Sequence, residues 1–149
     1  MTRNVVTCEP TDSLALAAQR MWDGDCGSLP IVDRDGTLVG ILTDRDICMA
    51  AWSRGQLLDS IRIDDVMSKV VFTVKPDDDI SLVETVMSEK QVRRIPVVDA
   101  SYKPIGILSM NDLAREAAHS KSKLRDGVSR AARTLAAVCR PRKSAQRAA

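Results

Sequence analysis

Apolar and polar residues along the first part of the chain follow two periods, one typical of helices and one typical of strands. In "TDSLALAAQRMW", the apolar residues Leu14, Ala17, Ala18 and Met21 share one helical face after a run of cap-forming residues. Short β-branched runs, "NVVTC", "SLPIVD" and "TLVGIL", predict strands, and "DRDG" predicts a turn between the last two.

A second helix is expected after these strands, from Asp44 to about Arg54, and Gly55 is a suitable residue to end it. The predicted order of elements is therefore strand, helix, strand, strand, helix.

The same pattern occurs a second time. A shift of 66 residues lays residues 1–47 over residues 67–113 without a gap, and 14 of those 47 positions are identical. The second copy reads "VVFTV", "DDISLVETVM", "RIPVVD" and "KPIGIL", with "ASYKP" replacing the turn, and a last helix is expected from Met110 to about Ser120. Its first helix would place Ile80, Val83 and Met87 on one face. Because the two segments stay aligned over 47 positions without a gap, the sequence indicates an internal duplication.

Composition and charge narrow the class of protein. The chain has 149 residues, of which 44% are hydrophobic and 28% are charged, and it contains no apolar run long enough to span a membrane and no secretory signal. We therefore expect a cytoplasmic protein. Its net charge of +2 is unevenly distributed, because residues 119–149 hold nine of the 22 basic residues and one of the 20 acidic residues.

The side chains that enzymes and metal sites require are scarce. The four cysteines are scattered without a "CxxC", and His119 is the only histidine. We expect four reduced thiols, mostly buried, and neither a zinc site nor a disulfide framework. No P-loop, "HExxH" or "GxSxG" motif is present, so we predict no catalytic residues and no enzyme activity.

The phrases "GILTDRD" and "GILSMND" place a hydroxyl residue three positions before an aspartate in each copy, as Thr43 with Asp46 and Ser109 with Asp112. This spacing is that of a helix capping box, with Asp in place of the commoner Glu. The same groups also suit a ligand, because a carboxylate accepts from adjacent ribose hydroxyls and a helix start attracts phosphate. Both interpretations stand at this point.

The duplicated pattern "LPIVDRDGTLVGILTDRDI" and "IPVVDASYKPIGILSMNDL" resembles a tandem pair of cystathionine-β-synthase (CBS) domains, called a Bateman module, over about residues 1–118. The resemblance implies a mixed α/β (α+β) fold of two pseudo-symmetric β-α-β-β-α repeats packed sheet to sheet. We expect repeat 1 at 1–55, a linker and repeat 2 at 56–118, and a basic amphipathic helix and tail at 119–149. The resemblance also implies regulation by an adenosine-containing ligand that binds between the repeats. This ligand would be AMP, ADP or ATP, with NAD and S-adenosylmethionine as further possibilities.

In such a module each copy contributes to each site. The resemblance implies a nucleotide site formed by Thr43, Arg45, Asp46, Thr73, Arg93, Arg94, Ile95 and Pro96. A second site would be formed by Thr7, Ser28, Leu29, Pro30, Ser109 and Asp112. The first should bind a phosphorylated ligand strongly and the second weakly or not at all, because guanidinium groups grip phosphate and only the first has them. The arginine pair could also be a solvated pair.

The segment "IRIDDV", residues 61–66, precedes repeat 2, and by the resemblance it is a lead-in element of that repeat. Repeat 1 has no equivalent, because Met1 already aligns with Met67. Either the natural chain starts upstream or repeat 1 lacks its lead-in.

The basic segment lies outside the resemblance. Leu124, Val128, Ala131, Leu135 and Val138 form one apolar helical stripe, Gly127 weakens the helix, and Pro141 marks its expected end. This helix could pack on the module or on a second subunit. It could instead contact nucleic acid, anionic lipid or an acidic partner, which would make the chain a structural or nucleic-acid-binding protein.

A homodimer is also expected. The apolar helix faces around Met21–Trp22 and Met87 would be left uncovered by a single pair of repeats, and such patches normally mark interfaces.

Overall fold

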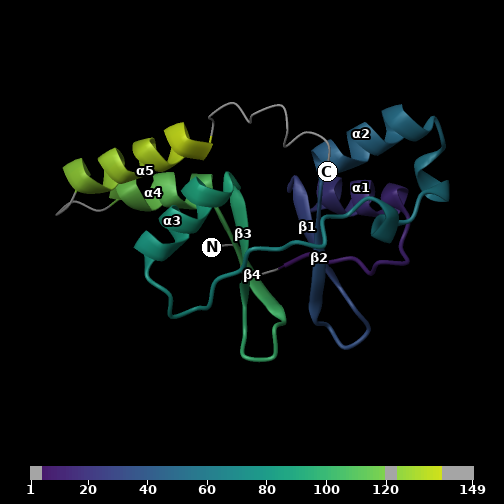
Figure 1. Cartoon of the computed structure of the whole chain (residues 1–149), viewed down its shortest axis with the longest axis horizontal. Coiled ribbons are helices and arrows are strands. Elements are labelled where there is room, and N and C mark those ends of the chain that lie inside the picture. Colours follow the sequence, from purple (N-terminus) through teal and green to yellow (C-terminus); the bar gives the residue numbers. More distant parts are fainter. Residues whose placement is uncertain (1–4, 120–123, 139–149) are drawn as a thin grey trace. The chain divides into compact units, whose positions relative to one another are not determined.

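The computed structural model describes residues 5–119 and 124–138. Its helices and strands follow in the order α1 (Leu14–Asp23), β1 (Ser28–Val32), β2 (Leu38–Thr43), α2 (Asp44–Arg54), α3 (Ile80–Lys90), β3 (Arg94–Val98), β4 (Pro104–Ser109), α4 (Met110–His119) and α5 (Leu124–Val138) (Figure 1). Two short 3-10 helices, Leu58–Ser60 and Ile63–Asp65, connect α2 to the second repeat. The mixed α/β fold and the element order of both repeats are confirmed.

The chain forms two compact units. Among the described residues, the larger comprises 5–76 and Pro96–Ile107, and the other comprises Asp77–Ile95, 108–119 and 124–138. β1 pairs with β2 in an antiparallel two-stranded sheet, and β3 pairs with β4 in another. Within the part of the chain that the structure describes, no helix is long and apolar enough to cross a membrane.

The helix boundaries follow from their capping residues. The Ser13 hydroxyl accepts from the Leu16 N–H at the start of α1. α2 ends at Arg54 because Gly55 adopts a left-handed conformation with φ of 58°, which residues with a Cβ rarely adopt. α4 ends at His119, one residue before the predicted end.

Aspartates organise both hairpin turns in the same way. Oδ1 of Asp33 accepts from the N–H groups of Asp35 and Thr37, and Oδ1 of Asp99 accepts from those of Ser101 and Lys103. The aspartate therefore performs the same task in both turns, although the residues that follow it differ between the copies.

The first strand of each repeat is smaller than predicted. Cys8 forms a single parallel bridge with Ile31, and Val74 forms the equivalent bridge with Val97. Pro10 and Pro76 follow two residues later, and because proline has no N–H it cannot continue the hydrogen-bonded ladder.

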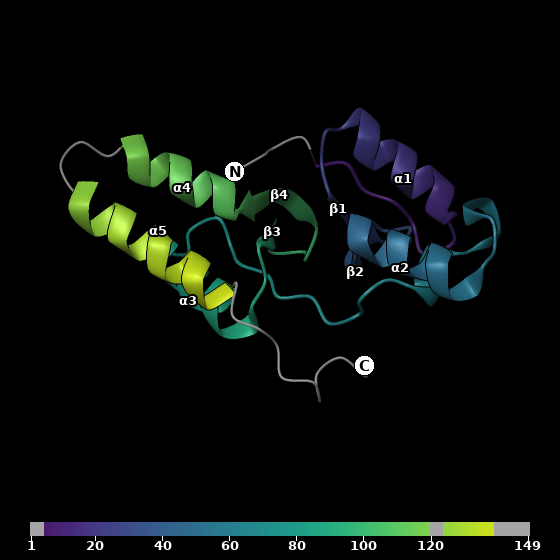
Figure 2. The ribbon, with the colours of Figure 1, turned by 90° about the horizontal axis from the view of Figure 1, so that it is seen from above.

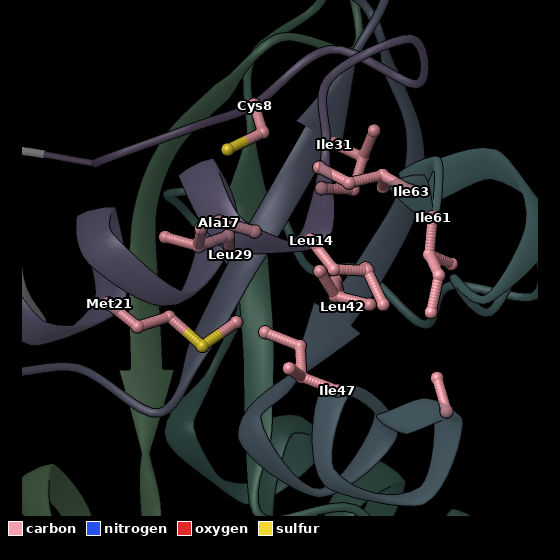
Figure 3. Close-up of a cluster of buried hydrophobic side chains, with 11 residues drawn as sticks. Cys8, Leu14, Ala17, Met21, Leu29, Ile31, Leu42, Ile47, Ile61 and Ile63 are labelled. Atoms are coloured by element: carbon pink, nitrogen blue, oxygen red, sulfur yellow. The ribbon is translucent and has the colours of Figure 1, made fainter. Parts of the chain in front are cut away.

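The core of the larger unit combines α1, α2 and the β1–β2 sheet with the segment that precedes repeat 2 (Figure 3). Ile61 and Ile63 are 1% and 0% exposed and belong to the same buried cluster as Leu14 and Leu42. The Leu14 N–H donates to Ile61 O, and the Ile63 N–H donates to Asp12 O. The resemblance implied that "IRIDDV" serves repeat 2, but its isoleucines complete the core of repeat 1.

Several burial predictions are wrong. Met21 and Met87 are 6% and 0% exposed, so they are core residues and not parts of uncovered faces. Ile80 is 41% exposed, because it is the first residue of α3 and the buried positions begin at Val83. Of the thiols that the structure describes, Cys8 is buried and Cys26 is half-buried, but Cys48 is exposed on α2.

In the other unit, α5 packs against both α3 and α4 (Figure 2). The Gln91 side chain donates to Ala137 O across this contact. Ala131 and Thr134 are the buried side chains of the described part of α5, whereas Leu135 is 47% exposed. The predicted helix is present, but the residue that it buries in this turn is Thr134 and not the predicted Leu135. The side chains of Leu124 and Val128, and residues from 139 onward, lie outside the described residues.

Candidate functional site

The start of α2 is held by a complete capping box. The Asp46 N–H donates to the Thr43 hydroxyl oxygen at 3.3 Å, and the Thr43 N–H donates to Asp46 Oδ2 at 2.9 Å. The Thr43 hydroxyl also donates to Asp46 Oδ2 at 2.6 Å. The capping interpretation of the "TxxD" spacing is therefore confirmed, and both side chains are half-buried.

The two capping contacts that reach the Asp46 carboxylate both use the same oxygen, Oδ2. Among the residues that the structure describes, none donates a hydrogen bond to Asp46 Oδ1. A fixed carboxylate with one open oxygen can accept from a ligand hydroxyl without giving up its cap. The structural and the ligand-binding interpretations of Asp46 are thus compatible.

The neighbouring N–H groups of α2 already have acceptors. The Asp44 N–H donates to Gly27 O at 3.3 Å, and the Arg45 N–H donates to Asp44 Oδ1 at 2.7 Å. The Arg45 side chain is exposed. A ligand at this helix start would therefore meet the open Asp46 oxygen sooner than it would meet a free backbone N–H.

The start of α4 repeats the same cap. The Ser109 N–H and hydroxyl donate to Asp112 Oδ2 at 2.9 and 2.6 Å, and the Asp112 N–H donates to the Ser109 oxygen at 3.3 Å. Burial of Asp112 opposes its ionisation, but the hydrogen bonds from the Ser109 hydroxyl and N–H favour the charged form, and the pKa of Asp112 lies below its usual value.

The two aspartates differ in their second oxygen. Asp112 Oδ1 accepts from the Arg115 guanidinium at 2.9 Å, in an ion pair between residues three apart on the helix. The repeat register places Met49 where Arg115 stands, so α2 has no equivalent cation. Sequence reasoning missed Arg115, although the Asp–Arg spacing of three residues is a usual sign of such a pair.

The other predicted site residues lie on the strands and the segments before them. Ser28, Leu29 and Pro30 are buried in β1, and Ile95 and Pro96 are buried in β3. Ser28 pairs with Thr43 across the sheet, although the resemblance assigned these two residues to different sites. Thr7 and Thr73 are half-buried, and Thr7 O accepts from the Arg20 guanidinium, another contact that sequence reasoning missed.

The arginine pair is described only within its own unit. Arg93 is exposed and Arg94 is half-buried. Arg93 O accepts from the Met110 N–H at 3.0 Å, so the backbone of Arg93 lies at the start of α4. Their part in a phosphate site remains a prediction.

The comparisons with known proteins agree on one protein family. A family model described as CBS domain matches residues 1–53 and 63–119. The protein MK0525 of Methanopyrus kandleri is 35% identical over 111 residues, which are 74% of this chain and 57% of that protein. The chain thus spans little more than half the length of this relative.

Two solved structures resemble the chain and contain ligands. The CBS domain pair of protein MJ0100, in complex with 5′-methylthioadenosine and S-adenosyl-L-methionine, is 29% identical, with a TM-score of 0.74. That match covers 81% of this chain and 94% of the other. CBSX2 in complex with AMP is 29% identical, with a TM-score of 0.68, and the match covers 78% of this chain and 91% of the other.

Proposed function

This chain belongs to the CBS domain family, and from that membership we propose that it is a non-catalytic regulatory module that binds an adenosine-containing ligand. Two of its structural relatives hold such ligands, namely S-adenosyl-L-methionine with 5′-methylthioadenosine in one and AMP in the other. Adenosine is the part that these ligands share, so adenosine is the part for which recognition is proposed.

The open oxygen of Asp46 is the observation that carries the proposal. Two ribose hydroxyls present two donors, and a carboxylate fixed at a helix start accepts them without an entropic cost for ordering its side chain. Thr43 holds Asp46 in place through its N–H and hydroxyl. We assign ribose binding to Asp46 and orientation of Asp46 to Thr43, with Arg93 and Arg94 as proposed phosphate ligands.

The sites are proposed to be unequal, because Arg115 competes for the second oxygen of Asp112. Exposed ion pairs contribute roughly 0–1 kcal/mol, and the Arg115 side chain is 70% exposed, so displacing it would weaken ligand binding only about fivefold or less. The stronger site is therefore assigned to Asp46 by its open oxygen as well as by the expected arginines.

Titration calorimetry with AMP, ATP, 5′-methylthioadenosine and S-adenosylmethionine tests the assignment. We expect Asp46→Ala to abolish the tighter binding event and Asp112→Ala to leave it nearly intact. Equal effects of the two substitutions would contradict the inequality of the sites, and no heat with any of the four ligands would contradict adenosine binding itself.

A homodimer is also part of the proposal.

A further inference from the structure

Two free thiols of the first repeat lie beside α1. Cys8, which is 1% exposed, belongs to the buried cluster of the larger unit (Figure 3), and the half-buried Cys26 packs against the same cluster. A Cβ on Gly24 would lie 3.4 Å from Val6 Cγ2 and 3.5 Å from Cys26 Sγ, so these two side chains approach one point. Val6 is two residues before Cys8, and alternate residues of an extended chain point to the same side. The Cys26 thiol therefore lies next to the segment that carries Cys8.

A guanidinium group contacts the buried thiol. Arg20 Nη1 donates to Cys8 Sγ at 3.6 Å and also to Thr7 O. The ion pair of Arg20 with Asp12 is long, at 3.9 Å. A guanidinium is costly to bring against an apolar cluster, so packing alone does not explain why this side chain contacts Cys8.

The second repeat shows what the fold alone requires at these positions. The Cys26 N–H donates to Met21 O at 2.9 Å, and the Val92 N–H makes the equivalent bond in the second repeat at 3.1 Å. The backbone is thus the same, and a valine side chain suffices for packing. The thiols and the guanidinium add chemistry that the fold does not need. The register places a valine at all three positions, namely Val74 for Cys8, Val86 for Arg20 and Val92 for Cys26.

We propose that Cys8 and Cys26 form an oxidation site, which a hydroperoxide converts to a disulfide within the chain. The half-buried Cys26 is the thiol that the oxidant reaches, and the buried Cys8 is the thiol that resolves the oxidised intermediate. Arg20 is a positioning residue, because it holds the Cys8 sulfur and stabilises its thiolate. The inference goes beyond adenosine binding and does not depend on it.

The reaction with hydrogen peroxide balances in two steps. In the first, the Cys26 sulfur attacks a peroxide oxygen, an S–O bond forms as the O–O bond breaks, and the thiol proton leaves with the other oxygen as water. Sulfur is oxidised to a sulfenic acid and the peroxide is reduced. In the second, the Cys8 sulfur attacks the Cys26 sulfur, an S–S bond forms as the S–O bond breaks, and the hydroxyl leaves with the Cys8 proton as a second water.

The surroundings of Cys8 suit a resolving thiol. Burial raises the pKa of the Cys8 thiol, and the Arg20 guanidinium opposes that effect. Because the thiolate is the nucleophile, a buried and neutral Cys8 is protected from direct attack on peroxide. Once Cys26 carries a sulfenic acid, the N–H of Arg20 at Cys8 Sγ favours loss of the Cys8 proton.

Mass spectrometry of the full chain treated with hydrogen peroxide tests the pairing. We expect the chain to lose the mass of two hydrogen atoms, and a digest without reduction to contain the peptides of Cys8 and Cys26 joined to each other. The variant Cys48→Ser/Cys139→Ser removes the other two cysteines and should form the same bond. A chain that forms no such bond, or that joins other cysteines instead, would overturn the proposal.

Valine substitutions taken from the second repeat test the order of the two steps. Cys8→Val and Cys26→Val should keep the fold, since valine stands at both equivalent positions. In Cys8→Val the sulfenic acid on Cys26 should persist, and dimedone should trap it. In Cys26→Val dimedone should trap little at Cys8, and trapping at Cys8 as fast as at Cys26 would overturn the assigned order.

The role of Arg20 has its own test. Arg20→Val should slow disulfide closure by about tenfold, the effect of losing one charge-assisted hydrogen bond. Arg20→Lys keeps the positive charge and should recover part of that rate. Trapping of the Cys26 sulfenic acid by dimedone should be equally fast in both variants, which a merely structural defect would not produce. Equal closure rates in the wild type and in Arg20→Val would overturn the role of Arg20.

Discussion

At the scale of single residues, the two aspartates show how one motif can serve structure and function at once. Asp46 and Asp112 cap their helices with the same oxygen and nearly the same distances. What distinguishes them is the residue three positions later, which is Met49 in one copy and Arg115 in the other. A capping box therefore does not exclude a ligand role, and the neighbouring side chain decides whether the second oxygen is open.

The lowered pKa of Asp112 gives a pH-dependent prediction. A carboxyl that ionises more easily in the folded state stabilises that state above its unfolded pKa of about 3.9, and this contribution is lost as the pH falls through the lower, folded value. Asp112→Asn should therefore cost about 1 kcal/mol of unfolding free energy at pH 7 and progressively less below about pH 4.

Urea unfolding at several pH values measures this difference. Asp59→Asn, which changes an exposed aspartate, is the control and should have little effect at any pH. A penalty for Asp112→Asn that is the same at neutral and at acid pH would show that the charge of Asp112 is not what stabilises the cap.

Gly40 is required by close packing and not by its backbone conformation. A Cβ at this position would lie 2.5 Å from Met67 Sδ and 3.1 Å from Ser68 O. Gly40→Ala should destabilise the fold by about 1–3 kcal/mol, because the core would be overpacked. Adding Met67→Ala should recover part of that loss, as a double-mutant cycle of unfolding free energies would show. No recovery would mean that the Ser68 backbone is the obstacle.

At the scale of elements, local signals predicted the helices well. Ser13, Thr43 and Gly55 mark helix boundaries through their own hydrogen bonds or backbone angles, so those boundaries were visible in the sequence. The short length of the first strands was not visible in the sequence. A β-branched run suggests a strand, but how many of its residues pair depends on a partner that is distant in the sequence. The ion pair of Asp112 Oδ1 with Arg115 was missed for a similar reason, because Arg115 lies outside the "SxxD" motif.

The segment before repeat 2 is the element whose role differed most from expectation. Periodicity cannot show which core a short segment joins, and the buried Ile61 and Ile63 join that of repeat 1. Ile63→Ala should lower the unfolding free energy by roughly 2–5 kcal/mol, the usual cost of a large-to-small change in a core. Leu57→Ala, at a position that is 78% exposed in the same connection, should cost less than about 0.5 kcal/mol. Similar costs in urea unfolding would contradict this role.

At the scale of the whole molecule, the duplication produces two similar repeats with different surfaces. The repeats share the caps of α2 and α4 and the aspartates of their turns, but one repeat exposes tryptophans and the other packs against α5. Sequence symmetry predicted equal helix faces, and the basic helix breaks that symmetry. Whether the basic segment 119–149 contacts an acidic partner, nucleic acid or lipid stays a prediction that a binding assay at two salt concentrations can test.

The docking of α5 leads to the last prediction, which concerns the stability of that contact. Ala131 is 9% exposed, and its neighbour Ala132 is exposed on the same helix. Ala131→Glu should weaken the packing of α5 on α3 and α4 and lower the unfolding free energy by about 1–3 kcal/mol, because it places a charged side chain at a buried position. Ala132→Glu introduces the same charge on the exposed side of α5 and should cost less than about 0.5 kcal/mol. Equal costs of the two substitutions in urea unfolding would show that Ala131 does not hold α5 in place.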